Sequence, residues 1–336
     1  MAAFIFRRTL WMLLVLFVVS IVTFFLMRAV PGGPFDTERE FPDSVTENIE
    51  ARFGLNEPLI VQYFRYITGI IVPIINESGP PTSTSEIYLV NVDLPGGEQT
   101  IRWMNFGPSL VHRSRSVTDI FQENLGVTFQ LGIGGILVAV VIGLPAGIMS
   151  ALNRNTGWDY LGMGIATIGV SITSITLGPL LQYVFGVELG VLPISGWGTF
   201  SHMIMPAFAL GFAQSAIIAR LTRASLLQVL NEDYIRTARA KGLSSRRVIW
   251  MHVLKNGMIP VVTVLGPIAA FLVTGSFITE QIFAIPGIGR AYVQSIGNRD
   301  YTLIMGTTLF FAFVLVIANT FVDISYAWLD PRIRYD

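Results

Sequence analysis

The chain has 336 residues, of which 52% are hydrophobic and only 13% are charged, and its mean hydropathy is +0.61. A soluble domain would carry about 25% charged residues, so this composition indicates a protein that is solvated by a bilayer. The 22 basic and 22 acidic residues give a net charge of zero, so the chain as a whole has no positive field to attract nucleic acid. The absence of cysteine excludes disulfides and thiol catalysis, and three scattered histidines argue against a metal site.

Six apolar stretches are long enough to cross a membrane, because a helix needs about 20 apolar residues to span a hydrocarbon core of about 30 Å. They cover residues 9–29, 126–152, 160–187, 202–221, 258–279 and 302–328. The sequence therefore predicts an all-α polytopic membrane protein with six transmembrane helices.

Two of these stretches, and one shorter run, allow a second interpretation. The first stretch follows Arg7 and Arg8 as a signal peptide would, but its apolar run exceeds the usual 7–15 or so residues and no A-x-A site follows. We therefore expect a retained helix. The third stretch is long enough to be tilted or broken, and Pro179 with its Ser and Thr neighbours predicts a kink. The run 69–75 is too short to span and is interpreted as the end of an interfacial helix.

Most basic residues fall on one side of this six-helix arrangement. Cytoplasmic loops carry an excess of Lys and Arg. The basic residues that fall on one side are Arg7, Arg8, Arg154, Arg220, Arg223, Arg236, Arg239, Lys241, Arg246, Arg247, Lys255, Arg332 and Arg334. The short loop between the third and fourth stretches has none. The pattern predicts that both termini are cytoplasmic.

The segment 30–125 between the first two helices is then external and too long for a turn. It contains amphipathic stretches at 47–53 and 60–71, and two short strands at 87–92 and 99–103 that flank a turn at 93–97. We expect a small ordered lobe that includes a β-hairpin.

Catalytic chemistry is not visible in the sequence. The apolar stretches hold almost no ionisable residues at mid-depth, and Glu280 and Asp323 lie near helix ends, whereas ion-coupled carriers place such residues at mid-membrane. No H-E-x-x-H motif and no G-x-x-x-x-G-K-[ST] loop is present. We expect no enzyme and no cofactor in this chain, so that ATP and Mg would be bound by partner chains.

The loop 223–257 is the most informative region. Residues 232–241 predict a helix with acidic residues at its start and basic residues at its end. Gly242 follows where a left-handed residue would end that helix, and Ser244 is placed to cap a second helix over 245–256. A loop that only sets membrane orientation needs charge but no pair of short helices. The pattern therefore favours a docking surface, although the charges alone fit the simpler interpretation.

This loop resembles that of the B-type membrane subunits of bacterial dipeptide and oligopeptide ABC importers, which are binding-protein-dependent inner-membrane components. The general importer motif begins Glu-Ala-Ala, has Gly six residues after the Glu and ends Leu-Pro. Here Arg236, Thr237 and Ala238 take the first places, Gly242 is kept, and Leu254-Lys255 takes the last. The Arg and Lys are typical of the peptide branch, but a salt bridge through the Glu does not carry over.

Further matches to this family extend over about 300 residues. They are Pro31-Gly-Gly-Pro, Phe53-Gly-Leu-Asn-Glu-Pro-Leu with Gln62-Tyr63, Leu192-Pro-Ile-Ser-Gly, Glu280-Gln-Ile-Phe-Ala-Ile-Pro-Gly-Ile-Gly-Arg, Arg299-Asp-Tyr and Leu329-Asp-Pro-Arg-Ile-Arg-Tyr. Residues 73–104 depart from the usual pattern and are interpreted as an insertion.

The resemblance implies a type I ABC importer permease fold with an N-terminal helix over 1–29, an external lobe over 30–125 and a five-helix core over 126–336. It implies a bacterial inner-membrane subunit that works with a homologous permease subunit, two cytoplasmic ATP-binding subunits and an extracytoplasmic substrate-binding protein, surrounded by lipid and without nucleic acid. The alternative is a channel or scaffold that works without ATPases.

The same resemblance implies two functional regions. The ATPase-coupling residues would be Arg236, Thr237, Ala238, Gly242, Leu243, Ser244, Arg246 and Arg247. The loop between the fifth and sixth helices would line or close the outer mouth, with Glu280, Phe283, Pro286, Gly287, Gly289 and Arg290 as external gate residues.

Overall fold

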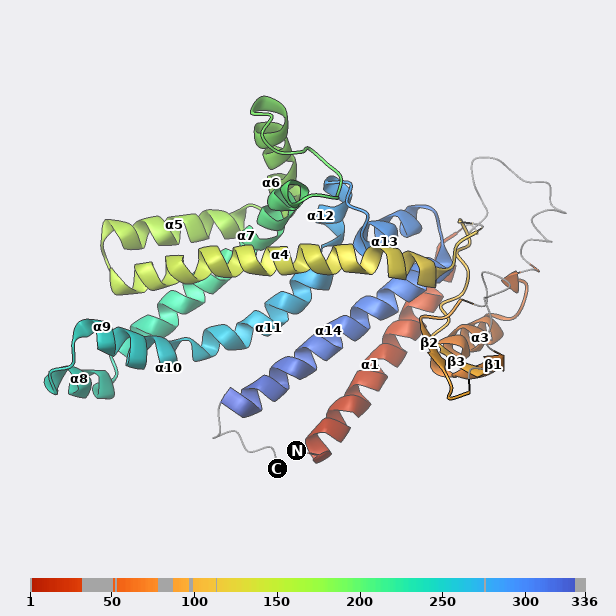
Figure 1. Cartoon of the computed structure of the whole chain (residues 1–336), viewed down its shortest axis with the longest axis horizontal. Coiled ribbons are helices and arrows are strands. Elements are labelled where there is room, and N and C mark those ends of the chain that lie inside the picture. Colours follow the sequence, from red (N-terminus) through yellow and green to blue (C-terminus); the bar gives the residue numbers. More distant parts are fainter. Residues whose placement is uncertain are drawn as a thin grey trace. The chain divides into compact units, whose positions relative to one another are not determined.

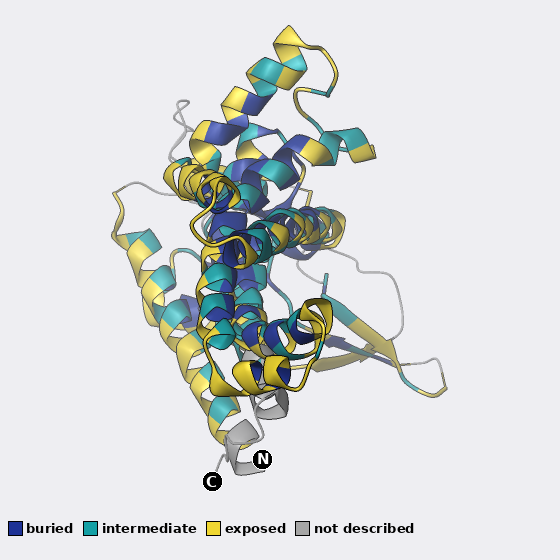
Figure 2. Ribbon diagram, turned by 90° about the vertical axis from the view of Figure 1, so that its left-hand side faces the viewer, coloured by how far each residue is buried: buried dark blue, intermediate teal, exposed yellow. Residues whose placement is uncertain are grey.

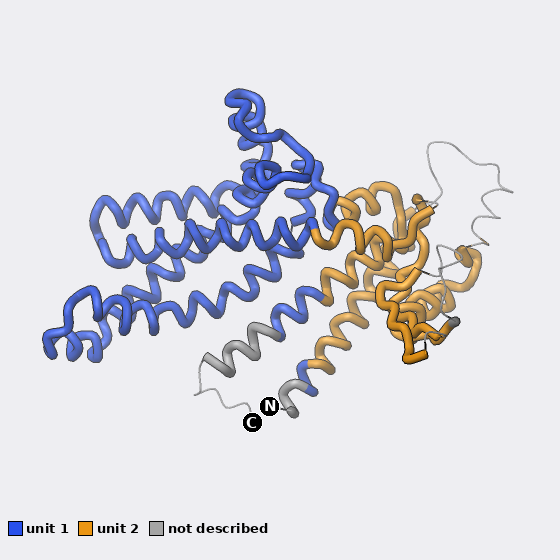
Figure 3. Tube along the Cα trace, in the orientation of Figure 1, with its two compact units in different colours: residues 1–8, 127–289, 314–336 blue, residues 9–126, 290–313 orange. Residues whose placement is uncertain are grey.

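The computed structural model describes residues 2–31, 51, 53–77, 87–96, 99–112, 114–274 and 276–329 (Figure 1). The chain divides into two compact units, which are described separately (Figure 3). Unit 1 comprises residues 1–8, 127–289 and 314–336, and unit 2 comprises 9–126 and 290–313. The expected stretch at 47–53, the end of the turn at 93–97 and the C-terminal motif lie largely or wholly outside the described residues.

The described chain contains five helices that are long and apolar enough to cross a membrane, or six if one bent pair counts as a single span. The five are contained in α1 (Ala2–Ala29), α4 (Val117–Leu152), α7 (Phe200–Leu230), α11 (Ile259–Thr274) with α12 (Phe277–Ile282), and α14 (Tyr301–Leu329). The prediction of an all-α polytopic membrane fold is confirmed, and each predicted span falls on one of these elements or on the bent pair.

The bent pair consists of α5 (Gly157–Ser171) and α6 (Ser174–Leu181), which continues as the π-helix η2 (Gln182–Glu188). The two halves meet at 101°. The predicted site of the kink was wrong, because Pro179 lies inside α6 and the break falls at Ile172 and Thr173. Both residues are β-branched, which disfavours helix, and both are extended. The helix restarts because the Thr173 carbonyl accepts hydrogen bonds from the N–H groups of Thr176 and Leu177.

Helix α7 is the centre of unit 1. In its most apolar window 56% of the residues are buried, compared with 11% for α1, and Figure 2 shows buried residues along the inner faces of the helices. The core joins side chains of α4, α6, α7 and α11, among them Leu131, Leu177, Leu210 and Leu272. The outward faces carry exposed apolar side chains, as expected where lipid or another subunit replaces water.

Helices α4 and α7 approach each other through small residues. Gly135, Ala139, Gly143 and Gly147 recur every fourth position along one face of α4. A Cβ atom added at Gly147 would lie 2.6 Å from the Ala219 carbonyl oxygen on α7. Apolar side chains gain nothing from leaving lipid for one another, so helices in membranes associate through close backbone packing of this kind.

In unit 2, α1 packs against a short helix, α3 (Leu59–Ile71). The Phe24 and Tyr63 rings meet edge to face with centroids 5.3 Å apart, and both side chains are buried with Met305. The Ser20 and Tyr63 hydroxyls lie 2.8 Å apart. With 13 residues, α3 is about 20 Å long, so it is too short to cross the membrane, and the expectation that 69–75 is not a seventh span is confirmed.

Unit 2 also contains an antiparallel sheet of β1 (Ile74–Glu77), β2 (Val90–Asp93) and β3 (Gln99–Trp103) in the order β1-β3-β2. Strands β2 and β3 form the predicted hairpin, with Val90 opposite Trp103. The pairing of β1 with β3, which sets Ile74 opposite Arg102, was not predicted. Whether residues 73–104 are an insertion relative to the family stays a prediction.

Asp300 connects two distant parts of unit 2. Its carboxylate accepts hydrogen bonds from the Leu303 N–H at the start of α14 and from the Ser109 hydroxyl and Leu110 N–H of the preceding lobe. The side chain is almost fully buried. Asp300 therefore caps α14, as an N-cap aspartate does, and fixes the segment that enters α4. Helix α13 (Ile288–Gly297) comes just before Asp300 in the chain.

The contact between α4 and α7 predicts a difference between two glycine substitutions. Gly147→Ala should destabilise the protein by about 1–3 kcal/mol, the usual cost of overpacking, because its Cβ has no space. Gly164→Ala should leave stability unchanged or raise it by up to about 1 kcal/mol, since a Cβ at this α5 position meets nothing within 4 Å. Thermal unfolding of both variants in the same detergent measures the difference, and equal midpoints would contradict the close approach.

Candidate functional site

The predicted pair of short helices is present in the loop after α7. Helix α8 (Asp233–Ala240) ends before Gly242, whose φ of 77° is left-handed. The second helical segment runs through α9 (Ser245–Val248), the π-helix η3 (Ile249–Leu254) and α10 (Lys255–Gly257) into α11. The helix–glycine–helix prediction is confirmed. Ser244 stands at the capping position, but its side chain makes no capping hydrogen bond, and the π-helical turn was not predicted.

The loop is anchored to the helices beneath it. Ile235 and Ala238 of α8 and Val248 and Val253 of the second segment are buried in one cluster with Leu226 of α7. Ala151 at the end of α4 and the half-buried Leu243 also pack in this cluster. The Ser225 hydroxyl donates to the Gly257 carbonyl over 2.7 Å. The loop is therefore a fixed surface at one end of unit 1.

The opposite face of the loop is exposed and basic. Arg236 makes an ion pair of 3.4 Å with the exposed Asp233. Four further cations of this loop, Arg239, Lys241, Arg246 and Arg247, make no ion pair within the described part of the chain. Trp250 is 67% exposed in the following turn and was missed from the sequence. Aromatic and Arg side chains are enriched at protein interfaces, so this face is suited to bind another protein.

A buried ion pair next to the loop was also missed. Asp159, near the start of α5, accepts bidentate hydrogen bonds of 2.8 and 2.9 Å from Arg223 of α7. The same carboxylate accepts from the Ser150 hydroxyl and from the Asn155 N–H. The Asp159 side chain is 4% exposed and Arg223 is 27% exposed. The pair therefore fixes the α4–α5 turn against α7 two residues before Ser225.

The expected outer gate lies at the other end of unit 1, where α12 leads into a non-helical segment. Phe283, Ile285, Gly287 and Gly289 are buried, whereas Pro286 is exposed. The segment therefore packs into the protein instead of lying on its perimeter. Arg290 is partly buried in the first turn of α13 and belongs to unit 2.

Glu280 is the polar centre of this segment. It is fully buried, and its Oε1 accepts hydrogen bonds from the Thr128 hydroxyl at 2.9 Å and the Ser276 hydroxyl at 2.6 Å. Thr128 in turn accepts a hydrogen bond from the Ile288 N–H at 2.9 Å. A Cβ at Gly287 would collide with the Glu280 carboxylate, and one at Gly289 would lie 2.5 Å from the Phe277 Cα. The glycines are needed because the backbone passes directly over Glu280.

This segment is also joined to the loop between η2 and α7. The Gly196 N–H donates to the Phe283 carbonyl over 2.8 Å. The Gln182 amide donates to the carbonyls of Ile282 and Ile194, at 3.1 and 2.9 Å. Hydrogen bonds therefore join two loops that are almost 100 residues apart in sequence. This connection was not predicted.

Apart from Arg290, which belongs to unit 2, the predicted site residues thus form two groups at opposite ends of unit 1. Sequence patterns identified both loops, because glycine and charge mark them locally. The residues that hold the loops in place lie in other elements, and only the fold brings them together.

Comparison with known proteins identifies the class of membrane protein. The family described as "Binding-protein-dependent transport system inner membrane component" matches residues 143–335, and the corresponding N-terminal family matches residues 1–80. The chain is 41% identical over 334 residues to the dipeptide transport system permease protein DppB of Bacillus subtilis (strain 168), covering 99% of this chain and 98% of that one. It is 40% identical over 337 residues to the oligopeptide transport system permease protein OppB of Haemophilus influenzae, covering 100% of both.

Solved structures agree on the fold. A structure titled as inward-facing conformations of the MetNI methionine ABC transporter aligns with a TM-score of 0.53 and 19% identity, over 63% of this chain and 96% of that one. A crystal structure of an amino acid ABC transporter with histidines aligns with a TM-score of 0.52 and 15% identity, over 63% and 94%. Over 63% of its length the chain therefore has the fold of an ABC importer permease.

The Asp159–Arg223 pair predicts an asymmetric response to substitution. Arg223→Met should destabilise the protein by about 3–5 kcal/mol, because it leaves a buried carboxylate without its counter-ion. Asp159→Asn should cost less, since the partly exposed guanidinium can reach water. Adding Asp159→Asn to Arg223→Met should recover stability. Unfolding midpoints of the two single variants and the double variant measure this, and strictly additive losses would show that the pair does not act as a unit.

Proposed function

This chain belongs to the family of binding-protein-dependent transport system inner membrane components, and we propose that its basic loop receives a cytoplasmic ATPase. The chain is a transmembrane subunit of an ATP-driven importer and forms part of the pathway for peptides or related small solutes. It is a transport subunit of the inner membrane and not an enzyme.

The observation that carries the proposal is the two-sided construction of the loop 231–257. Its underside is buried against α4 and α7 through Ile235 and Val248, and its other face presents exposed cations and Trp250. A loop that served only to orient the protein in the membrane would need the charges but not the anchored underside. A fixed, basic surface is suited to transmit force from a bound partner into the helices.

The remaining partners follow from the family. We propose that the complete importer contains a second, homologous permease subunit, two ATP-binding subunits that hold ATP and Mg, and an extracytoplasmic binding protein that delivers cargo. The alternative is a channel or scaffold that works without ATPases. Affinity purification from the native membrane distinguishes the two, because an importer subunit brings ATP-binding chains with it.

We also propose that the segment 283–289 is part of the outer gate. Non-helical backbone near the membrane is tolerated where it is buried in protein or lines a cavity, and this segment is packed over Glu280 and bonded to Gly196. A movement of α12 would therefore move both outer loops together.

The orientation of the chain gives a prediction for single cysteines, which report cleanly because the natural chain has none. Cysteine at the exposed Asn76 of β1 should react with an impermeant maleimide in right-side-out cells. Cysteine at the exposed Ser245 of α9 should react only after the membrane is opened. The opposite labelling pattern would invert the proposed topology and remove the loop from the cytoplasm.

Gly242 provides the sharpest test of coupling. Gly242→Val forces a β-branched residue into a left-handed conformation at a cost of at least about 1 kcal/mol, so α9 should be misdirected although nothing lies within 4 Å of the new Cβ. We expect membrane insertion to be unaffected and substrate-stimulated ATPase activity of the reconstituted complex to be lost.

Ala240→Val is the matched control, because Ala240 is exposed in the last turn of α8 and needs no left-handed backbone. It should keep the stimulation of the natural protein. If Gly242→Val also kept the substrate-stimulated ATPase activity, the proposal that this loop is a coupling element would be contradicted.

A further inference from the structure

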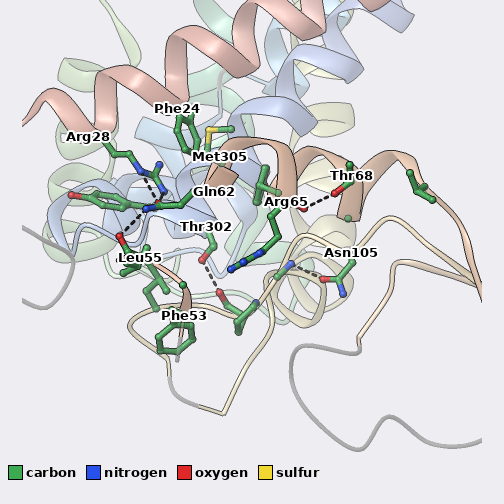
Figure 4. Close-up of a pocket in the computed structure, with 18 of the residues that line it drawn as sticks. Phe24, Arg28, Phe53, Leu55, Gln62, Arg65, Thr68, Asn105, Thr302 and Met305 are labelled. Atoms are coloured by element: carbon green, nitrogen blue, oxygen red, sulfur yellow. Dashed lines mark hydrogen bonds between the residues drawn. The ribbon is translucent and has the colours of Figure 1, made fainter. Parts of the chain in front are cut away.

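Unit 2 contains a cavity of about 620 Å³ that the proposed transport mechanism does not use (Figure 4). Its walls come from the end of α1, from α3, from the segment 105–110 and from the first turn of α14. Much of the lining is apolar and includes Phe24, Phe53, Leu55, Leu110 and Met305. The volume lies within the range of about 300–1,000 Å³ that is usual for small-molecule sites.

Arg28 gives this apolar cavity a positive charge. Its guanidinium lies 3.7 Å from the centroid of the Phe24 ring and donates through Nε and Nη2 to the Gln62 side-chain oxygen, at 3.2 and 2.7 Å. Gln62 is neutral, and its own amide is held by the Leu55 and Glu57 carbonyls. Among the described residues no carboxylate pairs with Arg28. A partly buried cation without a counter-ion attracts an anion.

Tyr66 adds an unused donor to the same lining. Its hydroxyl is enclosed and has no hydrogen-bond partner in the described part of the chain. Burial, with a smaller contribution from Asp300, raises the pKa of Tyr66 above its usual range, so the hydroxyl stays protonated and can donate. An enclosed polar group without a partner is costly, and a ligand that accepts its hydrogen bond would remove that cost.

The acidic groups near the cavity that the structure describes are already engaged. None of the described residues that line the cavity is Asp or Glu. Glu57 pairs with Arg65, which also lines the cavity. The Asp300 carboxylate is occupied by donors from Ser109, Leu110, Thr302 and Leu303. Among the described residues, the charge that faces the cavity is therefore positive.

We propose that this cavity binds a small organic carboxylate with an apolar body, with Arg28 holding the carboxylate and the aromatic and aliphatic walls holding the body. Two sources share this chemistry, the free C-terminus of a short apolar peptide and a medium-chain fatty acid. The proposal does not depend on the coupling role of the basic loop, because the cavity lies wholly within unit 2.

The test measures binding to the full-length chain in lipid nanodiscs by calorimetry, with empty nanodiscs as the blank. The probes are Leu-Phe against its C-terminal amide, and decanoate against decanol. The acid of at least one pair should bind about tenfold or more tightly than its neutral counterpart, the factor expected for a hydrogen bond to a charged group. The pair that shows the preference identifies the source.

Three variants locate the effect. Arg28→Gln should abolish the preference for the acid. Tyr66→Phe should weaken binding about threefold to tenfold, the range for one neutral hydrogen bond, while leaving the unfolding midpoint unchanged or higher because it removes an unsatisfied hydroxyl. Arg115→Gln is the control, since Arg115 is an exposed cation of unit 2 that pairs with Glu123 and does not line the cavity, and it should keep the preference.

Arg28→Gln also breaks the link between α1 and α3, so its unfolding midpoint is measured alongside. Tyr66→Phe keeps the test decisive if that variant fails to fold. The proposal is overturned if neither acid is preferred by the natural chain. It is equally overturned if the preference survives in Arg28→Gln or if Tyr66→Phe binds as the natural chain does.

Discussion

The structure of unit 1 depends on one constraint. Where the backbone leaves a helix, protein groups instead of water must form hydrogen bonds with its N–H and C=O groups. In the hydrocarbon core each unpaired N–H or C=O costs several kcal/mol, so non-helical segments persist only where protein groups replace the lost bonds. At the α5–α6 break the Thr173 carbonyl receives the first N–H groups of α6. At the segment after α12, the Phe283 and Ile282 carbonyls are taken by Gly196 and Gln182. The irregular segments are thus held by fixed partners.

The same constraint explains why the helices pack as they do. With all backbone bonds satisfied internally, the helices gain most from close approach, and the small residues of α4 allow the α7 backbone to come near. Gly143 and Gly147 face the carbonyls of Ser215 and Ala219. This close contact in turn brings Ser150 and Arg223 to Asp159. A local property of the sequence, one small residue every four positions, therefore determines where a long-range ion pair can form.

The sequence predicted those features that depend on residues close to one another in the chain. Apolar runs located the spans, charge and Gly242 located the basic loop, and the turn at 93–97 located the β2–β3 hairpin. Features that depend on two distant segments were not predicted. The β1 strand is recognisable only when β3 is beside it, and Asp159 looks like an ordinary helix-start residue until Arg223 approaches. The prediction of a kink at Pro179 was wrong, because the helix breaks earlier, at the β-branched residues 172 and 173.

The anchoring of the basic loop has a mechanical consequence. Leu226 packs under α8 and directly against Gly257, where an added Cβ would lie 2.5 Å from its side chain, and Ser225 bonds the same glycine. If a partner pushes on the exposed face as proposed, these contacts would carry the displacement to the ends of α7 and α11. Because Arg223 holds the start of α5 to α7, α5 would follow such a displacement under the proposed coupling. The 101° break after α5 is then the place where the far end can respond by turning instead of translating.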